Sequence, residues 1–73
     1  MKRIGEIIRD MRKARGWTAI ELARRAGLRD CMISMYERGA THPSLMSFIA
    51  LADAFEVPMD ELAGRTVTKE KQK

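Results

Sequence analysis

The residue types that most often carry catalysis or bind metal ions are scarce in this chain of 73 residues. His42 is the only histidine and Cys31 the only cysteine, so the usual metal-ligand spacings cannot be assembled. A Cys–His nucleophile pair is formally available, but Cys31 belongs to an exposed helix face and no side chain is placed to orient His42. The chain also lacks a glycine-rich phosphate loop. We therefore predict that the protein is not an enzyme and uses no metal or cofactor.

The charged side chains are divided unevenly along the chain, whose net charge is +4. Residues 1–42 carry ten Lys and Arg against five Asp and Glu. Residues 43–64 carry four acidic and no basic residues, and residues 65–73 are basic again. A basic region of this kind favours an anionic polymer such as a nucleic acid as partner. Small soluble proteins are often basic for other reasons, so charge alone leaves the partner open.

Residues 17–39 contain the elements that would position these side chains. Thr18 and Glu21 have the spacing of a capping box, which predicts a helix that begins at Thr18. Gly27 is expected where that helix closes with a left-handed backbone, and a second short helix follows from residue 29 or 30 until Gly39. Two helices joined by a tight turn that contains glycine form a helix-turn-helix.

The flanking segments predict three more helices. Apolar residues recur at helical spacing over about residues 2–15, 45–55 and 59–62. In the helix over residues 45–55, the predicted apolar side consists of Leu45, Phe48, Ile49, Ala52 and Phe55. No alternating β pattern is present, so we expect an all-α domain over residues 1–64 and a flexible basic tail over residues 65–73.

This arrangement resembles the lambda-repressor-like (Cro-type, XRE) family of prokaryotic and phage DNA-binding proteins. The resemblance is carried by the helix-turn-helix stretch WTAIELARRAGLRDCMISMYERG. It extends to IGEIIRDMRKARGW before that stretch and to ERGATHPSLMSFIALADAFEVPMDEL after it, so it covers about residues 4–62. It implies a compact five-helix domain that binds double-stranded DNA, with the second helix of the motif in the major groove.

The second helix of the motif has two faces on a helical wheel. Ile33 and Tyr36 lie on its core side, whereas Asp30, Ser34 and Arg38 lie on the side that would face a groove. By resemblance, the base-reading positions of the family are filled by Arg29, Asp30, Cys31, Ser34 and Met35. Most of these side chains are poor at the bidentate hydrogen bonding that Arg, Asn and Gln provide, so we expect a modest sequence preference.

The resemblance also implies contacts to the nucleic-acid backbone. Thr18 and Ala19 occupy the helix N-terminus that usually grips a phosphate, although the family often has Gln where this chain has Ala19. Further candidates for phosphate contacts, with a solvated charged face as the alternative for each, are Arg9, Lys13, Arg24, Arg25 and Arg38. Arg12 and Glu37 resemble the pair that ties the first helix to the end of the recognition helix, and we interpret this ion pair as structural.

We predict a DNA-binding transcriptional regulator, a repressor that binds a palindromic operator as a homodimer through its fourth or fifth helix. The alternative is a protein-interaction or antitoxin-like module of the same fold, which would use the apolar surface of Cys31, Met32 and Met35. An RNA-binding module is a third class, but the chain lacks interleaved aromatic residues, since Trp17 is expected to pack before the Thr18 cap.

Two further expectations concern location and ligands. The single cysteine, together with the absence of an apolar run long enough to span a bilayer, predicts a cytoplasmic protein that contacts no membrane. Because the chain has no separate ligand domain, we expect no small-molecule ligand.

Overall fold

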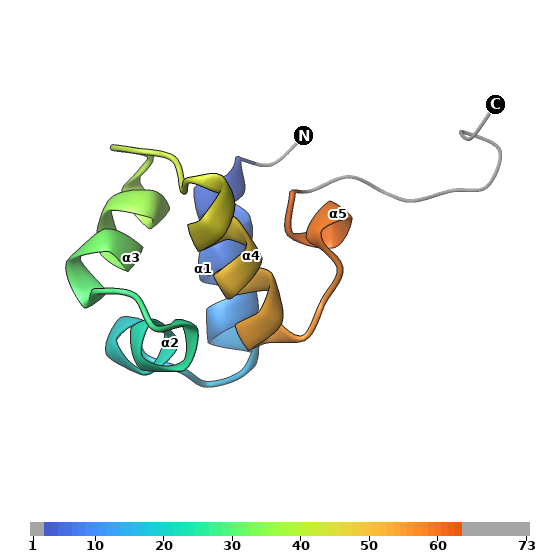
Figure 1. Cartoon of the computed structure of the whole chain (residues 1–73). Coiled ribbons are helices and arrows are strands. Elements are labelled where there is room, and N and C mark those ends of the chain that lie inside the picture. Colours follow the sequence, from blue (N-terminus) through green and yellow to red (C-terminus); the bar gives the residue numbers. More distant parts are fainter. Residues whose placement is uncertain (1–2, 64–73) are drawn as a thin grey trace, which may run out of the picture.

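Five α-helices make up the part of the chain that the computed structural model describes, residues 3–63 (Figure 1). They are α1 (Ile4–Ala14), α2 (Ala19–Ala26), α3 (Asp30–Arg38), α4 (Leu45–Phe55) and α5 (Met59–Leu62). No strand is found within these residues, and the predicted all-α fold with five helices is confirmed. The predicted tail of residues 65–73 lies outside the described range, so its boundary stays a prediction. No helix in residues 3–63 is long and apolar enough to cross a membrane.

Side chains and glycines at the helix ends satisfy backbone groups that a helix leaves unpaired. The hydroxyl of Thr18 accepts a hydrogen bond from the Glu21 amide at 3.0 Å, and the hydroxyl of Ser44 caps α4 in the same way. Gly27 and Gly39 close α2 and α3 with φ values of 72° and 77°, a left-handed conformation that glycine adopts without strain. The two helices of the motif therefore end at the predicted glycines.

Both ends of α1 differ from expectation, whereas α4 ends as predicted but without a glycine. α1 begins at Ile4 and not at residue 2, because Arg3 has an extended backbone (φ −72°, ψ 152°), and it ends one residue early, at Ala14. α4 is closed by Glu56, whose φ of 60° is also left-handed. Glycine is the usual residue at such a position. The chain has to leave the helix here because Pro58 disfavours helical geometry at the residue before it.

All five helices contribute side chains to one hydrophobic core. The buried core residues are Ile7, Ile8, Leu22, Ala23, Ile33, Tyr36, Leu51, Ala52, Phe55 and Leu62. The prediction for the apolar side of α4 is partly wrong, since Leu45 is 66% exposed while Leu51 is fully buried. α4 carries charge only at Asp53, so its sequence shows no polar face from which the buried side could be chosen.

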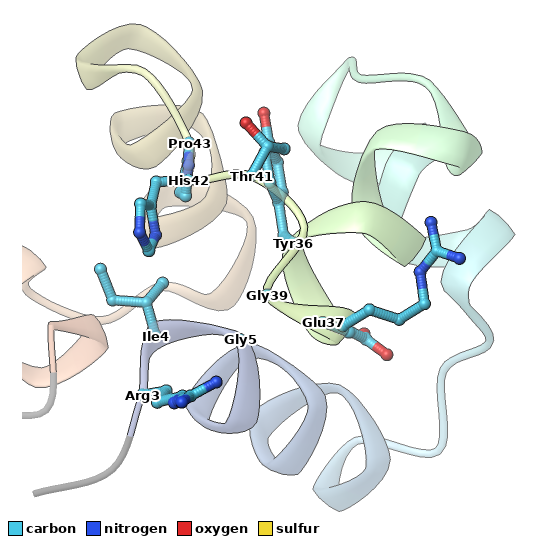
Figure 2. A pocket seen from close by; sticks show the side chains of 10 residues that line it. Arg3, Ile4, Gly5, Tyr36, Glu37, Gly39, Thr41, His42 and Pro43 are labelled. Carbon is cyan, nitrogen blue, oxygen red and sulfur yellow. The ribbon is translucent and has the colours of Figure 1, made fainter.

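α1 and α3 approach so closely that backbone meets backbone. A Cβ atom added to Gly5 of α1 would lie 2.1 Å from the carbonyl oxygen of Tyr36 and 3.1 Å from that of Glu37, near the end of α3. Figure 2 shows Gly5 beside this end of α3. A side chain at Gly5 therefore cannot be accommodated unless one of the two helices moves.

We expect Gly5→Ala to destabilise the protein. At an open helix position, replacing glycine with alanine stabilises by about 0.5–1 kcal/mol, whereas overpacking costs about 1–3 kcal/mol. Because the clash involves the backbone of α3, overpacking should dominate and the free energy of unfolding, measured by urea titration, should fall. Glu6→Ala, at the exposed neighbouring position, is the control and should change it little. A Gly5→Ala protein as stable as this control would contradict the close approach.

Candidate nucleic-acid interface

α3 lies at the edge of the helix cluster, with one side against the core and the other side open (Figure 1). Ile33 and Tyr36 are buried on its inner side. Of the predicted base-reading residues, Met35 is half-buried and the others are exposed, namely Arg29, Asp30, Cys31 and Ser34. These five residues thus gather at the start and along the first turns of one helix face.

The N-terminus of α2 is open to an anion. The Glu21 amide donates to the Thr18 hydroxyl, and the Leu22 amide donates to the Thr18 carbonyl, at 3.0 Å each. The amides of Ala19 and Ile20 have no acceptor within the described residues. Unpaired amides and the positive end of the helix dipole favour a phosphate at this place.

Glu21 forms ion pairs with Arg24 and Arg25, two of the residues predicted to contact phosphates. Its Oε2 accepts from Arg24 Nη2 at 2.5 Å and from Arg25 Nε at 2.6 Å, and its Oε1 accepts from Arg24 Nε at 3.3 Å. These interactions, above all the hydrogen bonds from Arg24, lower the pKa of Glu21. The capping box is therefore half formed, because the carboxylate binds the arginines and not the amide of Thr18. Positive charge beside the start of α2 is partly neutralised.

Trp17 is half-buried and packs against the hydrophobic core. Its ring stacks on Phe55 with the centroids 5.8 Å apart and the planes 7° apart, and the guanidinium of Arg25 covers it at 4.3 Å. Arg15 lies 5.0 Å from the Phe55 ring and donates to the Phe55 carbonyl oxygen at 2.8 Å, where it caps the end of α4. Trp17 is thus a packing residue and does not offer its ring to bases.

The remaining candidates for phosphate contacts are spread over two helices. Arg9 and Lys13 are exposed and lie one turn apart on α1. Arg38 is exposed at the last position of α3, roughly 12 Å along the helix axis from Asp30. A nucleic acid would have to extend beyond α3 itself to contact all three of these side chains.

Arg12 and Glu37 form a two-point ion pair between α1 and α3. Arg12 Nε donates to Glu37 Oε2 at 2.7 Å and Arg12 Nη2 donates to Glu37 Oε1 at 3.0 Å. Arg12 Nη1 also donates to the Trp17 carbonyl oxygen at 2.8 Å, so the same guanidinium holds the segment that leads into α2. The side chains are only 14% and 11% exposed, and the hydrogen bonds to Glu37 raise the pKa of Arg12 above its usual value. Bidentate geometry and low exposure make this pair an anchor for α3.

Sequence reasoning missed three features that position this surface. The close approach at Gly5 had a signal, since a glycine inside a helix is unfavourable and often marks a tight contact. The two arginines bound to Glu21 also had one, because they follow it at i+3 and i+4. The bond from Arg15 to Phe55 had no local signal, since the two residues are 40 positions apart.

The chain is similar to known proteins in both sequence and structure. A helix-turn-helix family model matches residues 8–62. The chain is 34% identical over 70 residues to the cryptic phage CTXphi transcriptional repressor RstR of Vibrio cholerae, covering 96% of this chain and 62% of that protein. It is 38% identical over 64 residues to the HTH-type transcriptional regulator AnsR of Bacillus subtilis, covering 88% of this chain and 52% of that protein. The chain thus spans only about half to three fifths of the length of these relatives.

The fold is also similar to that of the P22 c2 repressor, solved in complex with a synthetic operator. The TM-score is 0.80 at 31% sequence identity, and the match covers 85% of this chain and 94% of that chain. Sequence and structure comparisons therefore agree on one type of domain.

We expect Arg12→Ala to damage the fold before it damages any recognition surface. Removing one partner of a buried ion pair costs about 3–5 kcal/mol, and the small remaining exposure of this pair points to the lower end of that range. The thermal midpoint should fall markedly, and a double-mutant cycle with Glu37→Gln should reveal strong coupling. Arg9→Ala, at an exposed position of α1, is the control. Unchanged stability with weakened DNA binding would show that the pair is not structural.

Proposed function

The chain belongs to the lambda-repressor-like helix-turn-helix family, and we propose that it is a DNA-binding transcriptional regulator, a repressor that binds a palindromic operator as a homodimer. The observation that carries this proposal is the open face of α3, with polar and thiol side chains gathered at its start while its other side is buried. The names of its relatives RstR and AnsR, a repressor and a regulator, support the same function and not an enzymatic one.

In this proposal the first turn of α3 reads base edges in the major groove. Arg29 is the strongest reader, because its exposed guanidinium makes no capping hydrogen bond and can donate two hydrogen bonds to guanine. Asp30 can accept a hydrogen bond only from cytosine, and Met35 can contact a thymine methyl group. Ser34 and Cys31 add weak contacts. Selectivity beyond one or two base pairs per half-site would then come from the shape and deformability of the DNA.

The phosphate backbone would be held on either side of the groove. The unpaired amides at the start of α2, beside Thr18 and Ala19, bind one phosphate through the helix dipole. The exposed cations that would add further contacts are Arg9, Lys13, Arg24, Arg25 and Arg38. Because these contacts are electrostatic, binding should weaken steeply as salt is raised.

The proposed homodimer would form through α4, α5 or both. Met46 and Met59 are 73% and 39% exposed, and large apolar side chains at a surface often mark an interface. A two-fold dimer would place its recognition helices about 34 Å apart, one turn of B-DNA. The alternative of a protein-interaction module using the α3 surface is less well supported, because Met32 and Met35 are half-buried and only Cys31 of that apolar group is exposed.

Selection of bound sequences from a random pool of DNA duplexes tests the function directly. We expect a two-fold symmetric motif with few fixed positions in each half-site, and an affinity that falls with log salt at a slope of about 0.9 per phosphate contacted. Arg29→Ala should relax one position by about 1–3 kcal/mol if Arg29 reads a base, and weaken all sequences alike if it holds a phosphate. Binding without salt dependence, or no enrichment of any motif, would exclude the proposed function. An asymmetric motif would exclude the dimer alone.

Glu21 should limit the affinity for DNA. Because its carboxylate neutralises Arg24 and Arg25 beside the proposed phosphate site, Glu21→Gln should tighten non-specific binding by roughly two- to fivefold, as expected for losing one charge repulsion of about 1 kcal/mol in water. The salt slope should become steeper as well. Asp53→Asn removes the same charge from α4 and should have little effect. If the two substitutions change the affinity equally, only net charge matters and the local arrangement does not.

A further inference from the structure

A pocket of about 420 Å³ lies where the start of α1, the end of α3 and the loop after α3 meet (Figure 2). Arg3 and Ile4 come from the start of α1, Arg38 and Gly39 from the end of α3, and His42 from the loop. Figure 2 shows His42 and Ile4 facing one another across it. The proposed base-reading residues, by contrast, stand at the opposite end of α3. The pocket is therefore separate from the proposed base-reading surface.

The charged groups of the pocket favour an anion. Arg3 contributes a guanidinium group and His42 an imidazole ring, from two different segments. Among the described residues that line it, only Glu37 has a carboxylate, and this group already accepts two hydrogen bonds from Arg12. Figure 2 shows this carboxylate directed away from His42. Positive charge is thus in excess inside the pocket.

Backbone N–H groups at the start of α1 also favour an anion in this pocket. Arg3 is the cap residue of this eleven-residue helix and makes no side-chain capping bond. The first backbone bond runs from the Ile7 amide to the Arg3 carbonyl at 3.1 Å, so the amides of Ile4, Gly5 and Glu6 have no acceptor among the described residues. Ile4 and Gly5 themselves line the pocket. These donors and the positive end of the helix dipole suit a phosphate or carboxylate group.

The same wall contains a hydroxyl of a nearly buried residue that has no partner among residues 3–63. Tyr36 lines the pocket and is only 3% exposed, yet its hydroxyl makes no hydrogen bond to any described residue. Figure 2 shows its ring running from α3 toward Thr41 in the loop. Buried polar groups are nearly always hydrogen-bonded, so this hydroxyl calls for a ligand or water as its partner.

We propose that this pocket binds a small anionic molecule, a phosphate ester or carboxylate with a compact apolar body. The anionic group would lie against the first amides of α1, Arg3 and His42, and the apolar body against Ile4, Pro43 and the Tyr36 ring. The volume falls within the range of about 300–1,000 Å³ that is usual for small-molecule sites. This inference departs from the sequence-based expectation that the chain takes no small-molecule ligand, and it does not depend on the proposed function.

The test is a titration of the ¹⁵N-labelled full chain at constant ionic strength, followed through its backbone amides. Inorganic phosphate should shift the amides of Ile4 and Gly5 in a saturable way, and chloride should not. Phenyl phosphate and benzoate should also shift them. Phenyl phosphate should bind at least about tenfold more tightly than inorganic phosphate, because burying the apolar surface of its ring is favourable. Equal affinity for the two phosphates would overturn the proposal of a small-molecule site.

Matched variants separate this pocket from other anion sites. Arg3→Gln combined with His42→Gln should weaken phenyl phosphate at least about tenfold, whereas Arg9→Gln, the same change on the exposed side of α1, should leave it unchanged. Both altered side chains of the double variant are exposed, so its melting temperature should stay close to that of the parent protein. Equal shifts of the Ala19 amide at the start of α2 would indicate non-specific binding at helix ends and overturn the proposal.

A second arm distinguishes a free ligand from the phosphates of bound DNA, which share its chemistry. A short duplex should bind together with phenyl phosphate, and the Arg3/His42 double variant should bind the duplex as the parent protein does. If the duplex displaces phenyl phosphate and the double variant loses affinity for both by the same factor, the pocket is part of the DNA backbone contact and the proposal is wrong.

Discussion

The contact between α1 and α3 is the interaction on which the rest of the structure depends. Gly5 lets the two backbones meet, Ile8 is fully buried one turn further along, and Arg12 binds Glu37 at two points another turn on. The same Arg12 side chain holds the Trp17 carbonyl at the entrance to α2. Because the inner side of α3 packs against α1, this contact sets the direction in which the exposed side of α3 points. α1 thus sets the orientation of the exposed face of α3.

The basic residues serve two purposes that compete for the same side chains. Arg12 and Arg15 are used within the protein, one in an ion pair and the other as a cap on α4. Arg25 is shared between Glu21 and the Trp17 ring. The positive charge counted from composition therefore overstates what is available to a nucleic acid. What remains exposed is distributed around the motif, which suits contacts with a long charged polymer at several points.

The two ends of α3 have different surroundings and different chemistry. Its beginning, around Arg29 and Asp30, is exposed and follows the turn that starts at Gly27. Its end is enclosed by α1 and by the following loop, and there Ile4, Gly5 and Tyr36 line one pocket. α3 has only nine residues, which is fewer than three helical turns. Both surfaces therefore belong to the same short helix.

The sequence by itself determined the features that depend on near neighbours in the chain. The caps at Thr18 and Ser44 and the glycines that close α2 and α3 set the helix boundaries, because these are interactions within one or two turns. Periodicity likewise separated the inner and outer faces of α3. Only the tertiary structure decided which side of α4 is buried, since that helix is apolar on nearly every side and its neighbours make the choice. It also decided the partners of Arg15 and the pocket beside Gly5, because such contacts join segments far apart in the chain and leave no periodic pattern.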